Sequence, residues 1–293
     1  MSLKESTLFC VDTDKCISCG SCQKVCAGMV LHLNQDGIPV MDDFDEFGWG
    51  GCWKCEHCLA VCPGGAISIF GKRPEASIQT VKPETAASVM DALVMNRHSC
   101  RRFLKKDVPA KTIDAMLQRI GNAPNGGNKQ QVEFTLIDDR TQMEIFRSLA
   151  YAEMDRLAAQ GVYPAGFDKP SYEDMKRWEK TVRPEMLFCG APYLLIPHAP
   201  LGKGEPVEDV NIAAAYFELL CASRGLGCVM MTFPKDALKN MPEIRGMLRI
   251  PEDHYVGVML GFGWPEIRYT RGTKRGVEET RIHRLHFETE ETK

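Results

Sequence analysis

The sequence lacks an excess of charge of either sign, because 36 basic side chains oppose 39 acidic ones in 293 residues. Such a balance leaves no electrostatic footprint for nucleic acid. No apolar run approaches the roughly 18 residues that suggest a membrane-spanning helix. Residues 1–16 lack the apolar stretch of a secretory signal peptide. We therefore expect no nucleic-acid partner, no membrane span and no secretion, and we expect a cytoplasmic protein.

Several catalytic signatures are also missing. The sequence contains no P-loop, no H-E-x-x-H and no G-x-S-x-G motif. The segment Gly225-Leu226-Gly227 continues as Cys228, so the third glycine of a dinucleotide-binding fingerprint is absent. The sequence therefore lacks the usual motifs of nucleotide hydrolases, zinc proteases and serine hydrolases. If NAD(P)H binds, it must bind without the dinucleotide-binding fingerprint.

Cysteine, in contrast, is abundant, and its pattern is regular. Eight cysteines form two copies of C-x2-C-x2-C-x3-C: Cys16, Cys19, Cys22 and Cys26, then Cys52, Cys55, Cys58 and Cys62. Three closely spaced thiolates can hold three corners of an iron–sulfur cube, and in two-cluster proteins the fourth comes from the other copy. We therefore predict two [4Fe–4S] clusters, one on Cys16, Cys19, Cys22 and Cys62, the other on Cys52, Cys55, Cys58 and Cys26.

Other uses of these cysteines are less consistent with the pattern. The second copy is followed by Pro63 and resembles bacterial two-cluster ferredoxins, whereas Ala27 follows the first copy. Paired C-x2-C motifs also bind structural zinc, but the third and fourth cysteines do not follow zinc spacing. Disulfides are disfavoured without a secretory context. We expect the remaining cysteines to be small buried hydrophobic residues: Cys10, Cys100, Cys189, Cys221 and Cys228.

Composition divides the chain into two domains. Residues 1–72 carry nine acidic and five basic side chains and few aliphatic residues, which is typical of a small metal-stapled domain. The polar stretch Gly71–Thr85 contains two prolines and predicts a linker over residues 73–85. Residues 86–293 would then form the second domain.

The second domain shows helical periodicity interspersed with short apolar runs. We expect helices near residues 84–95, 109–121, 143–157 and 210–225, and strands at 133–137, 193–197 and 255–261. This pattern predicts an α+β or mixed α/β domain. The polar and aromatic segment Gly161–Arg183 could cover a site.

Two segments of this domain carry candidate binding residues. Arg97, Ser99 and Arg101 concentrate positive charge and a hydroxyl group, which suits a phosphate; the alternative is a basic surface turn. The turn-rich loop of residues 123–131 contains Asn128 and Gln130, whose amides can reach the edge of a heterocycle; the alternative is an ordinary loop.

Together with Gly225-Leu226-Gly227 and Gly263-Trp264-Pro265, these segments resemble the FMN-dependent nitroreductase family over about residues 84–276. Asn125 and Gln131 stand where that family has serine and proline. The resemblance implies an α+β fold with a mixed sheet and flanking helices, and a homodimer with FMN at each interface.

The resemblance also implies roles for individual residues. Arg97, Ser99 and Arg275 would hold the phosphate, with Arg101, Asn128 and Gln130 toward the ring. Met231 and Thr232 would lie near the ring, and Arg271 is a further contact. A donor near N1 stabilises the anionic reduced flavin.

The combination of domains implies a ferredoxin-linked flavoenzyme. The external donor would be a reduced ferredoxin-like protein that feeds the clusters, or NAD(P)H, which the resemblance allows to stack directly on FMN. FMN would then reduce a small acceptor such as a nitro compound or a quinone. One alternative is a non-enzymatic electron carrier or redox sensor; another is reductive dehalogenation on the same fold. His98 and Cys100 could form a base–nucleophile pair, but strand alternation should direct both away from Ser99.

Overall fold

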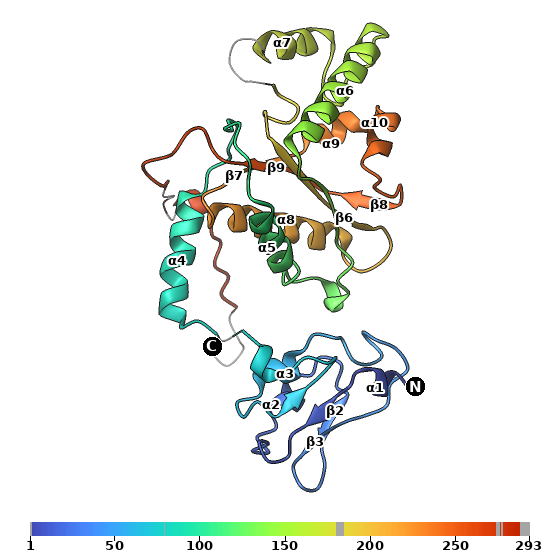
Figure 1. Cartoon of the computed structure of the whole chain (residues 1–293), viewed down its shortest axis with the longest axis vertical. Coiled ribbons are helices and arrows are strands. Elements are labelled where there is room, and N and C mark those ends of the chain that lie inside the picture. Colours follow the sequence, from blue (N-terminus) through green and yellow to red (C-terminus); the bar gives the residue numbers. More distant parts are fainter. Residues whose placement is uncertain (1, 79, 180–184, 274–275, 277, 288–293) are drawn as a thin grey trace.

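The computed structural model describes residues 2–78, 80–179, 185–273, 276 and 278–287. A small N-terminal part with short elements lies at one end of the molecule. A larger part, in which helices surround a sheet, lies at the other end (Figure 1). The predicted α+β class is confirmed. Within the described residues, no helix is long and apolar enough to cross a membrane.

The N-terminal part consists of two small sheets and three short helices. Its elements are α1 (Leu3–Ser6), β1 (Cys10–Val11), α2 (Ser21–Lys24), β2 (Leu31–Leu33), β3 (Pro39–Met41), α3 (His57–Val61) and β4 (Ile67–Ser68). β1 pairs with β4 and β2 with β3, both antiparallel. Its core mixes aliphatic side chains such as Leu31 and Ile67 with the thiols of Cys22, Cys52 and Cys58. These three motif cysteines are thus structural members of a small core.

The connection to the larger part contains η1 (Pro74–Ala76) and leads into α4 (Pro83–Asn96). A proline begins this helix, where its missing N–H costs nothing. The helix expected near residues 84–95 is confirmed. No described residue of α4 is buried, and its exposed hydrophobic side chains are Val89, Met90, Val94 and Met95.

The sheet of the larger part has five strands. They are β5 (Glu133–Ile137), β6 (Tyr193–Pro200), β7 (Gly227–Met231), β8 (His254–Val256) and β9 (Met259–Gly263). The order is β5-β6-β9-β7, with β8 also on β6. All these strand pairs are antiparallel. Among the described residues, one parallel pairing is present, an isolated bridge between Ser99 and Cys228. The mixed character of the expected sheet therefore rests on that bridge.

The strand expected at residues 255–261 is two strands. His198 pairs with Val256 and Leu195 with Leu260, so residues 257–259 face only residues 196–197. One extra residue on one strand is the spacing of a β-bulge. The bulge lets β8 and β9 use the same edge of β6.

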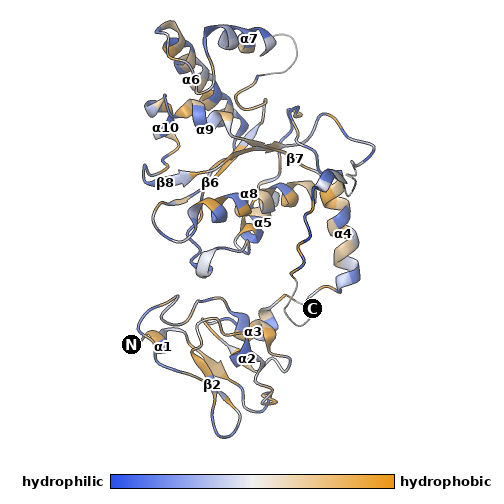
Figure 2. Cartoon of the chain, turned by 180° about the vertical axis from the view of Figure 1, so that it is seen from behind, coloured by the Kyte–Doolittle hydropathy of each residue, from blue (hydrophilic) through white to orange (hydrophobic). Residues whose placement is uncertain are grey.

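Helices cover both faces of the sheet (Figure 1). One face packs against α5 (Ala110–Ile120) and α8 (Pro206–Ala222). The other packs against α6 (Arg140–Ala159), α7 (Lys169–Glu179), α9 (Phe233–Leu238) and α10 (Pro242–Met247). Two short turns complete the described elements: η2 (Gly126–Asn128) and η3 (Glu278–Thr280). Figure 2 shows hydrophobic residues in strand β6 and along parts of α8.

The segment expected to cover a site contains α7. Tyr172 and Met175 on this helix are buried in the same core as α6. The end of the segment, including Arg183, lies outside the described residues. The described part of α7 is therefore a packed helix rather than a loose flap.

Candidate functional site

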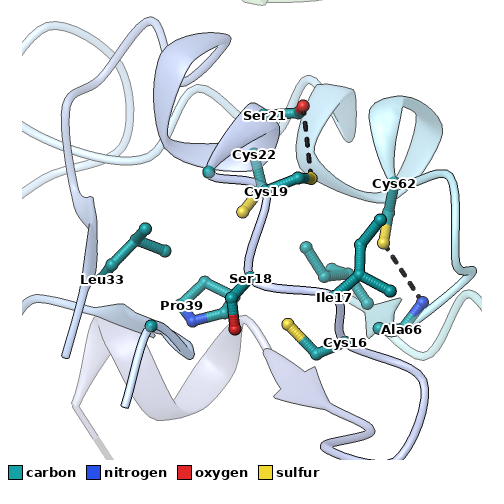
Figure 3. Close-up of a pocket in the computed structure, with 13 residues that line it drawn as sticks. Cys16, Ile17, Ser18, Cys19, Ser21, Cys22, Leu33, Pro39, Cys62 and Ala66 are labelled. Atoms are coloured by element: carbon teal, nitrogen blue, oxygen red, sulfur yellow. Dashed lines mark hydrogen bonds between the residues drawn. The ribbon is translucent and has the colours of Figure 1, made fainter. Parts of the chain in front are cut away.

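Four thiols line one small cavity in the N-terminal part. The cavity has a volume of about 20 Å³ and is lined by Cys16, Cys19, Cys22 and Cys62, among other residues (Figure 3). Three of these thiols belong to the first motif copy, and the fourth belongs to Cys62 of the second copy, which directly follows α3. The backbone N–H of Ala66 donates to Cys62 Sγ at 3.2 Å, a bond type that tunes cluster potentials.

The remaining four thiols are also neighbours. Burial raises the pKa of Cys58 to about 12, and the thiols of Cys55, Cys52 and Cys26 add to that increase. Burial likewise raises the pKa of Cys52, with a further increase from Cys55 and Cys26. Cys26, from the first copy, therefore lies with three cysteines of the second. This is the crossed arrangement that the spacing predicts, and the assignment of ligands stays a prediction.

Close backbone contacts hold the two motif copies together. A side chain on Gly28 would overlap the carbonyl of Gly51, and one on Gly64 would overlap the carbonyl of Lys15. Only glycine permits such approaches. The thiols are thus brought together by loops whose packing depends on these glycines.

The segment carrying the arginine motif is fixed at the edge of the sheet. Cys100 N donates to the carbonyl of Cys228 at 2.8 Å, and Leu104 N donates to the carbonyl of Trp264 at 2.9 Å. Phe103 also bridges Pro265. The arginine motif, the Gly225–Gly227 turn and the Gly263–Pro265 segment are therefore neighbours in space.

The expected phosphate-binding residues differ in their surroundings. Arg97 Nη1 donates to Glu218 Oε1 on α8 at 3.0 Å, and the Glu218 side chain is mostly buried. Ser99 is half-buried, whereas Arg101 and Arg271 are exposed. Arg275 lies outside the described residues. The ion pair with Glu218 thus fixes the position of Arg97, whereas Arg101 and Arg271 are exposed to solvent.

The amide-bearing loop reaches the N-terminal part. Asn128 Nδ2 donates to the backbone carbonyl of Trp53 at 2.9 Å, a residue between Cys52 and Cys55. The loop is held by Asn125, whose Oδ1 accepts from Gln130 N at 2.8 Å. The sequence marked Asn125 only as a departure from the family pattern, but the structure gives it this bracing role.

Two buried polar atoms near this contact have no partner among the described residues: Trp53 Nε1 and Gln131 Oε1. Buried polar groups are normally hydrogen-bonded. One is a donor and the other an acceptor, and only Gln131 belongs to the loop of residues 123–131.

The two groups of residues expected at the flavin site contact α8 at different points. Arg97 contacts α8 at Glu218, and Gly126 N contacts it at Asp209 Oδ1, 2.8 Å away. Asp209 and Glu218 are nine positions apart, which is about 13.5 Å along the helix axis. The loop and the arginine motif therefore lie toward opposite ends of α8.

The two consecutive methionines of β7 face opposite sides. Met231 is only 6% exposed and belongs to the hydrophobic core, whereas Met230 is 37% exposed. Thr232 is exposed at the start of α9. Met230 is thus the methionine with an accessible side chain, although the family pattern implied Met231.

His98 and Cys100 do not form a catalytic pair in this structure. The His98 ring stacks on Tyr269 at 3.9 Å between centroids. Cys100 is buried, and its thiol donates to the carbonyl of Arg102 at 3.1 Å. Burial raises the pKa of this thiol. Both side chains are engaged in packing, as strand alternation predicts.

The prediction that Cys10 is buried was wrong. Cys189, Cys221 and Cys228 are buried as expected, but Cys10 is exposed. It begins the two-residue strand β1, whose small sheet covers it on one side only. Cys10 is thus an accessible thiol outside both motif copies.

A larger cavity opens beside α7. Its volume is about 470 Å³, within the range of small-molecule sites. The lining combines hydrophobic and polar side chains: Phe167, Met175, Trp178 and Met186 with Ser171, Asp174 and Arg177. Asp174 and Arg177 form an ion pair at 2.9 Å. The cavity can accommodate an aromatic molecule.

Comparison with known proteins agrees with these two parts. Residues 94–264 match the nitroreductase family model, and residues 15–67 match the 4Fe-4S dicluster domain model. The crystal structure of a nitroreductase with bound FMN from Desulfitobacterium hafniense covers 68% of this chain and 98% of its own, with a TM-score of 0.52 and 20% identity. That similarity shows the fold.

Two curated relatives match at 26% identity. The iodotyrosine deiodinase of Thermotoga neapolitana aligns over 176 residues, 59% of this chain and 87% of its own length. The iodotyrosine dehalogenase 1 homolog of Caenorhabditis elegans aligns over 177 residues, 57% of this chain. The match spans 52% of that relative's length. The family model covers more than half of the chain, which therefore belongs to the nitroreductase family and carries a 4Fe-4S dicluster ferredoxin domain before its nitroreductase domain.

Proposed function

We propose that this protein is an oxidoreductase that passes electrons from two [4Fe–4S] clusters to FMN and on to a small acceptor, such as a nitro compound or a quinone. The clusters supply single electrons, and FMN can deliver two electrons together as a hydride. The contact between Asn128 and Trp53 carries this proposal, because it joins a cluster loop directly to the predicted flavin loop.

The chain's own residues divide into two cofactor-holding groups. The crossed cysteine sets would hold the clusters. Arg97 and Ser99 would bind the FMN phosphate, while Asn128, Gln130 and Gln131 would contact the ring edge. Further contacts are proposed for Arg101, Thr232, Arg271 and Arg275, and Met230 joins Met231 as a candidate beside the ring.

The structure suggests a direction for electron entry. Cys19, in the first set, is exposed, whereas Cys58, in the second, is buried. Trp53 lies inside the second set's loop and touches Asn128. We therefore propose that a reduced ferredoxin-like protein, a one-electron donor, acts at the first set and that the second set adjoins the flavin. NAD(P)H, a hydride donor, would instead reduce FMN directly.

A homodimer would complete the flavin site. The arginine motif and the Asn128 loop lie toward opposite ends of α8 in one chain, so a second chain can supply the missing half of each site. The exposed hydrophobic residues of α4, such as Val89 and Val94, would then be covered. Light scattering should give about twice the 32.8 kDa mass of the chain.

Turnover under strictly anaerobic conditions tests the proposal. With reduced ferredoxin as donor and a nitroaromatic as acceptor, the full chain should reduce the acceptor. Cys55→Ser should bind FMN normally but lose ferredoxin-driven turnover, because the second cluster cannot assemble. Full ferredoxin-driven turnover by Cys55→Ser would contradict the proposed electron route. If the unmodified chain does not bind FMN, the protein would instead be an electron carrier or a redox sensor.

Reductive dehalogenation is the second candidate, favoured by the names of the two curated relatives. The reaction replaces the carbon–iodine bond of an iodotyrosine with a carbon–hydrogen bond, using two electrons and one proton and releasing iodide. The cavity beside α7 would bind the aromatic acceptor. Detection of tyrosine and iodide as products would favour this chemistry over nitroreduction.

A further inference from the structure

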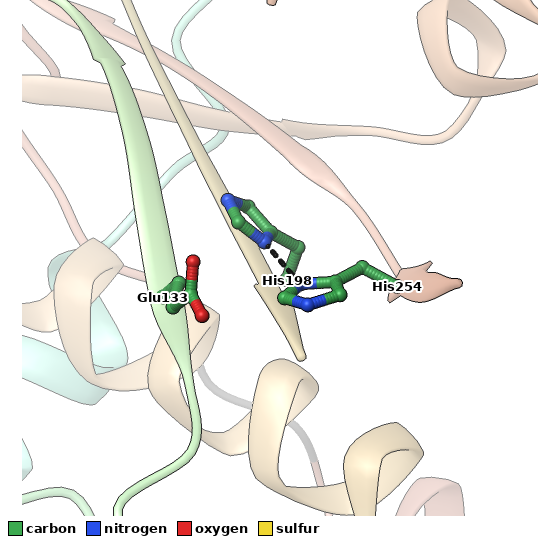
Figure 4. Close-up of side chains that lie close together, drawn as sticks. All are labelled: Glu133, His198 and His254. Carbon is green, nitrogen blue, oxygen red and sulfur yellow. Dashed lines mark hydrogen bonds between the residues drawn. The ribbon is translucent and has the colours of Figure 1, made fainter. Parts of the chain in front are cut away.

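Three potential metal ligands meet on one face at the end of the main sheet. Glu133 begins β5, His198 lies on β6 and His254 begins β8 (Figure 4). Glu133 pairs directly with His198, and His254 pairs with Pro200, two residues further along β6. Side chains at such positions share one face of a sheet. Their ligand atoms all lie within 4.8 Å of one another, and none of the three serves the proposed cofactors.

The two histidines are buried and face each other. His198 Nδ1 and His254 Nδ1 are 2.8 Å apart, and both residues are buried. A neutral imidazole keeps a lone pair on one nitrogen, and that lone pair can bind a metal ion. The pair therefore presents two candidate metal-binding nitrogens side by side.

Thr135 orients the ring of His198. Its hydroxyl donates to the carbonyl of Leu248 at 3.4 Å and lies 3.1 Å from His198 Nε2. In the tautomer that carries its proton on Nε2, His198 donates to this hydroxyl, and its Nδ1 lone pair faces His254. Histidines that bind metals are usually held through their other nitrogen in this way.

We propose that Glu133, His198 and His254 bind one divalent transition-metal ion, represented by zinc. Two imidazoles and one carboxylate are a common ligand set for such ions. Two metal–nitrogen bonds at a tetrahedral angle separate the nitrogens by about 3.3 Å, so the rings need to move apart by only about half an ångström. Glu133 is exposed, which leaves room for a water molecule as fourth ligand. The ion would clip the three-residue strand β8 to β5 and β6.

Metal analysis of the full holoprotein tests this site. After EDTA treatment, anaerobic protein is dialysed against micromolar zinc, and zinc and iron per chain are measured by mass spectrometry. One zinc should bind without loss of iron. Glu133→Gln and His254→Gln should weaken zinc binding by more than about 100-fold, and Thr135→Val by about 10- to 100-fold. His32→Gln is the matched control, because His32 pairs with Asp42 at 2.9 Å in the other domain.

The exposed Glu133→Gln variant keeps the test decisive if a buried histidine variant fails to fold. No zinc binding by the iron-replete wild type would overturn the proposal. Equal zinc uptake by Glu133→Gln and the wild type would also overturn the proposal. Zinc that displaces iron in all variants would do the same, because in both cases zinc would be bound by other ligands. Selective loss in the three site variants, with His32→Gln unaffected, would support it.

Discussion

The side-chain amide of Asn128 donates to the backbone carbonyl of Trp53 across the junction between the two parts of the protein, at 2.9 Å. Trp53 lies between two cysteines of the second motif copy, and its ring packs edge-on against Trp49. One neutral hydrogen bond contributes only about 0.5–1.5 kcal/mol, so its importance is positional. It keeps a cluster loop against the predicted flavin loop.

Loss of this hydrogen bond should slow electron delivery to the flavin. Asn128→Ala should reduce the rate of flavin reduction by about 3- to 10-fold, the range that corresponds to one hydrogen bond. Stopped-flow mixing with reduced ferredoxin, followed by flavin absorbance, measures the rate. Asn122→Ala, an exposed amide after α5, is the control. An unchanged rate in Asn128→Ala with FMN fully bound would contradict a role for this junction.

Double substitutions distinguish crossed from uncrossed cluster ligands. If Cys16 and Cys62 share a cluster, Cys16→Ser with Cys62→Ser removes one cluster and leaves about four irons. Cys16→Ser with Cys26→Ser then affects both clusters and leaves almost none. An uncrossed arrangement gives the opposite result. The iron and acid-labile sulfide content per chain measures how many clusters remain. Cys10→Ser, which changes an exposed thiol outside the motifs, is the control and should retain about eight irons.

Arg97 should recognise the phosphate of FMN rather than its ring. Arg97→Ala should weaken FMN binding by about 10- to 100-fold, because a hydrogen bond to a charged group contributes about 1.5–3 kcal/mol. Binding of riboflavin, which has no phosphate, should change little. Fluorescence titration of apoprotein with both ligands measures the difference. Equal losses for FMN and riboflavin would assign Arg97 a structural role, and Arg268→Ala, an exposed arginine, should affect neither.

Cys100 should be inert toward alkylation near neutral pH. Burial raises its thiol pKa, so less of the reactive thiolate is present at a given pH than for an ordinary cysteine. Its reaction with iodoacetamide should stay slow until the pH exceeds the ordinary thiol value of about 8.5. Mass spectrometry should find Cys10 modified first. Rapid labelling of Cys100 at pH 7 in folded protein would contradict its packing role.

Features with local signals could be predicted from the sequence. The cysteine spacing predicts the thiol sets because each cluster loop places three ligands within a few residues. The helix at residues 109–121 follows from the period of Ile113, Met116 and Ile120, which are buried in α5. The break between β8 and β9 could not be predicted, because the apolar run across Gly257 gives no register signal.

Contacts between distant segments had no such signal. Asn128 and Trp53 are 75 positions apart, and His198 and His254 are 56 apart. Their proximity depends on how the two parts dock and on the register of β8 against β6. The choice between Met230 and Met231 likewise depended on which face of β7 met the core, since most of that strand is buried.

The cofactor content of anaerobically purified protein tests the central claim most directly. Iron, acid-labile sulfide and FMN should be measured per chain on the same sample. The account predicts about eight irons, about eight sulfides and about one FMN. Eight irons without FMN, even after FMN is added, would contradict the flavoenzyme. Zinc in place of iron on the motif cysteines would contradict electron transfer itself.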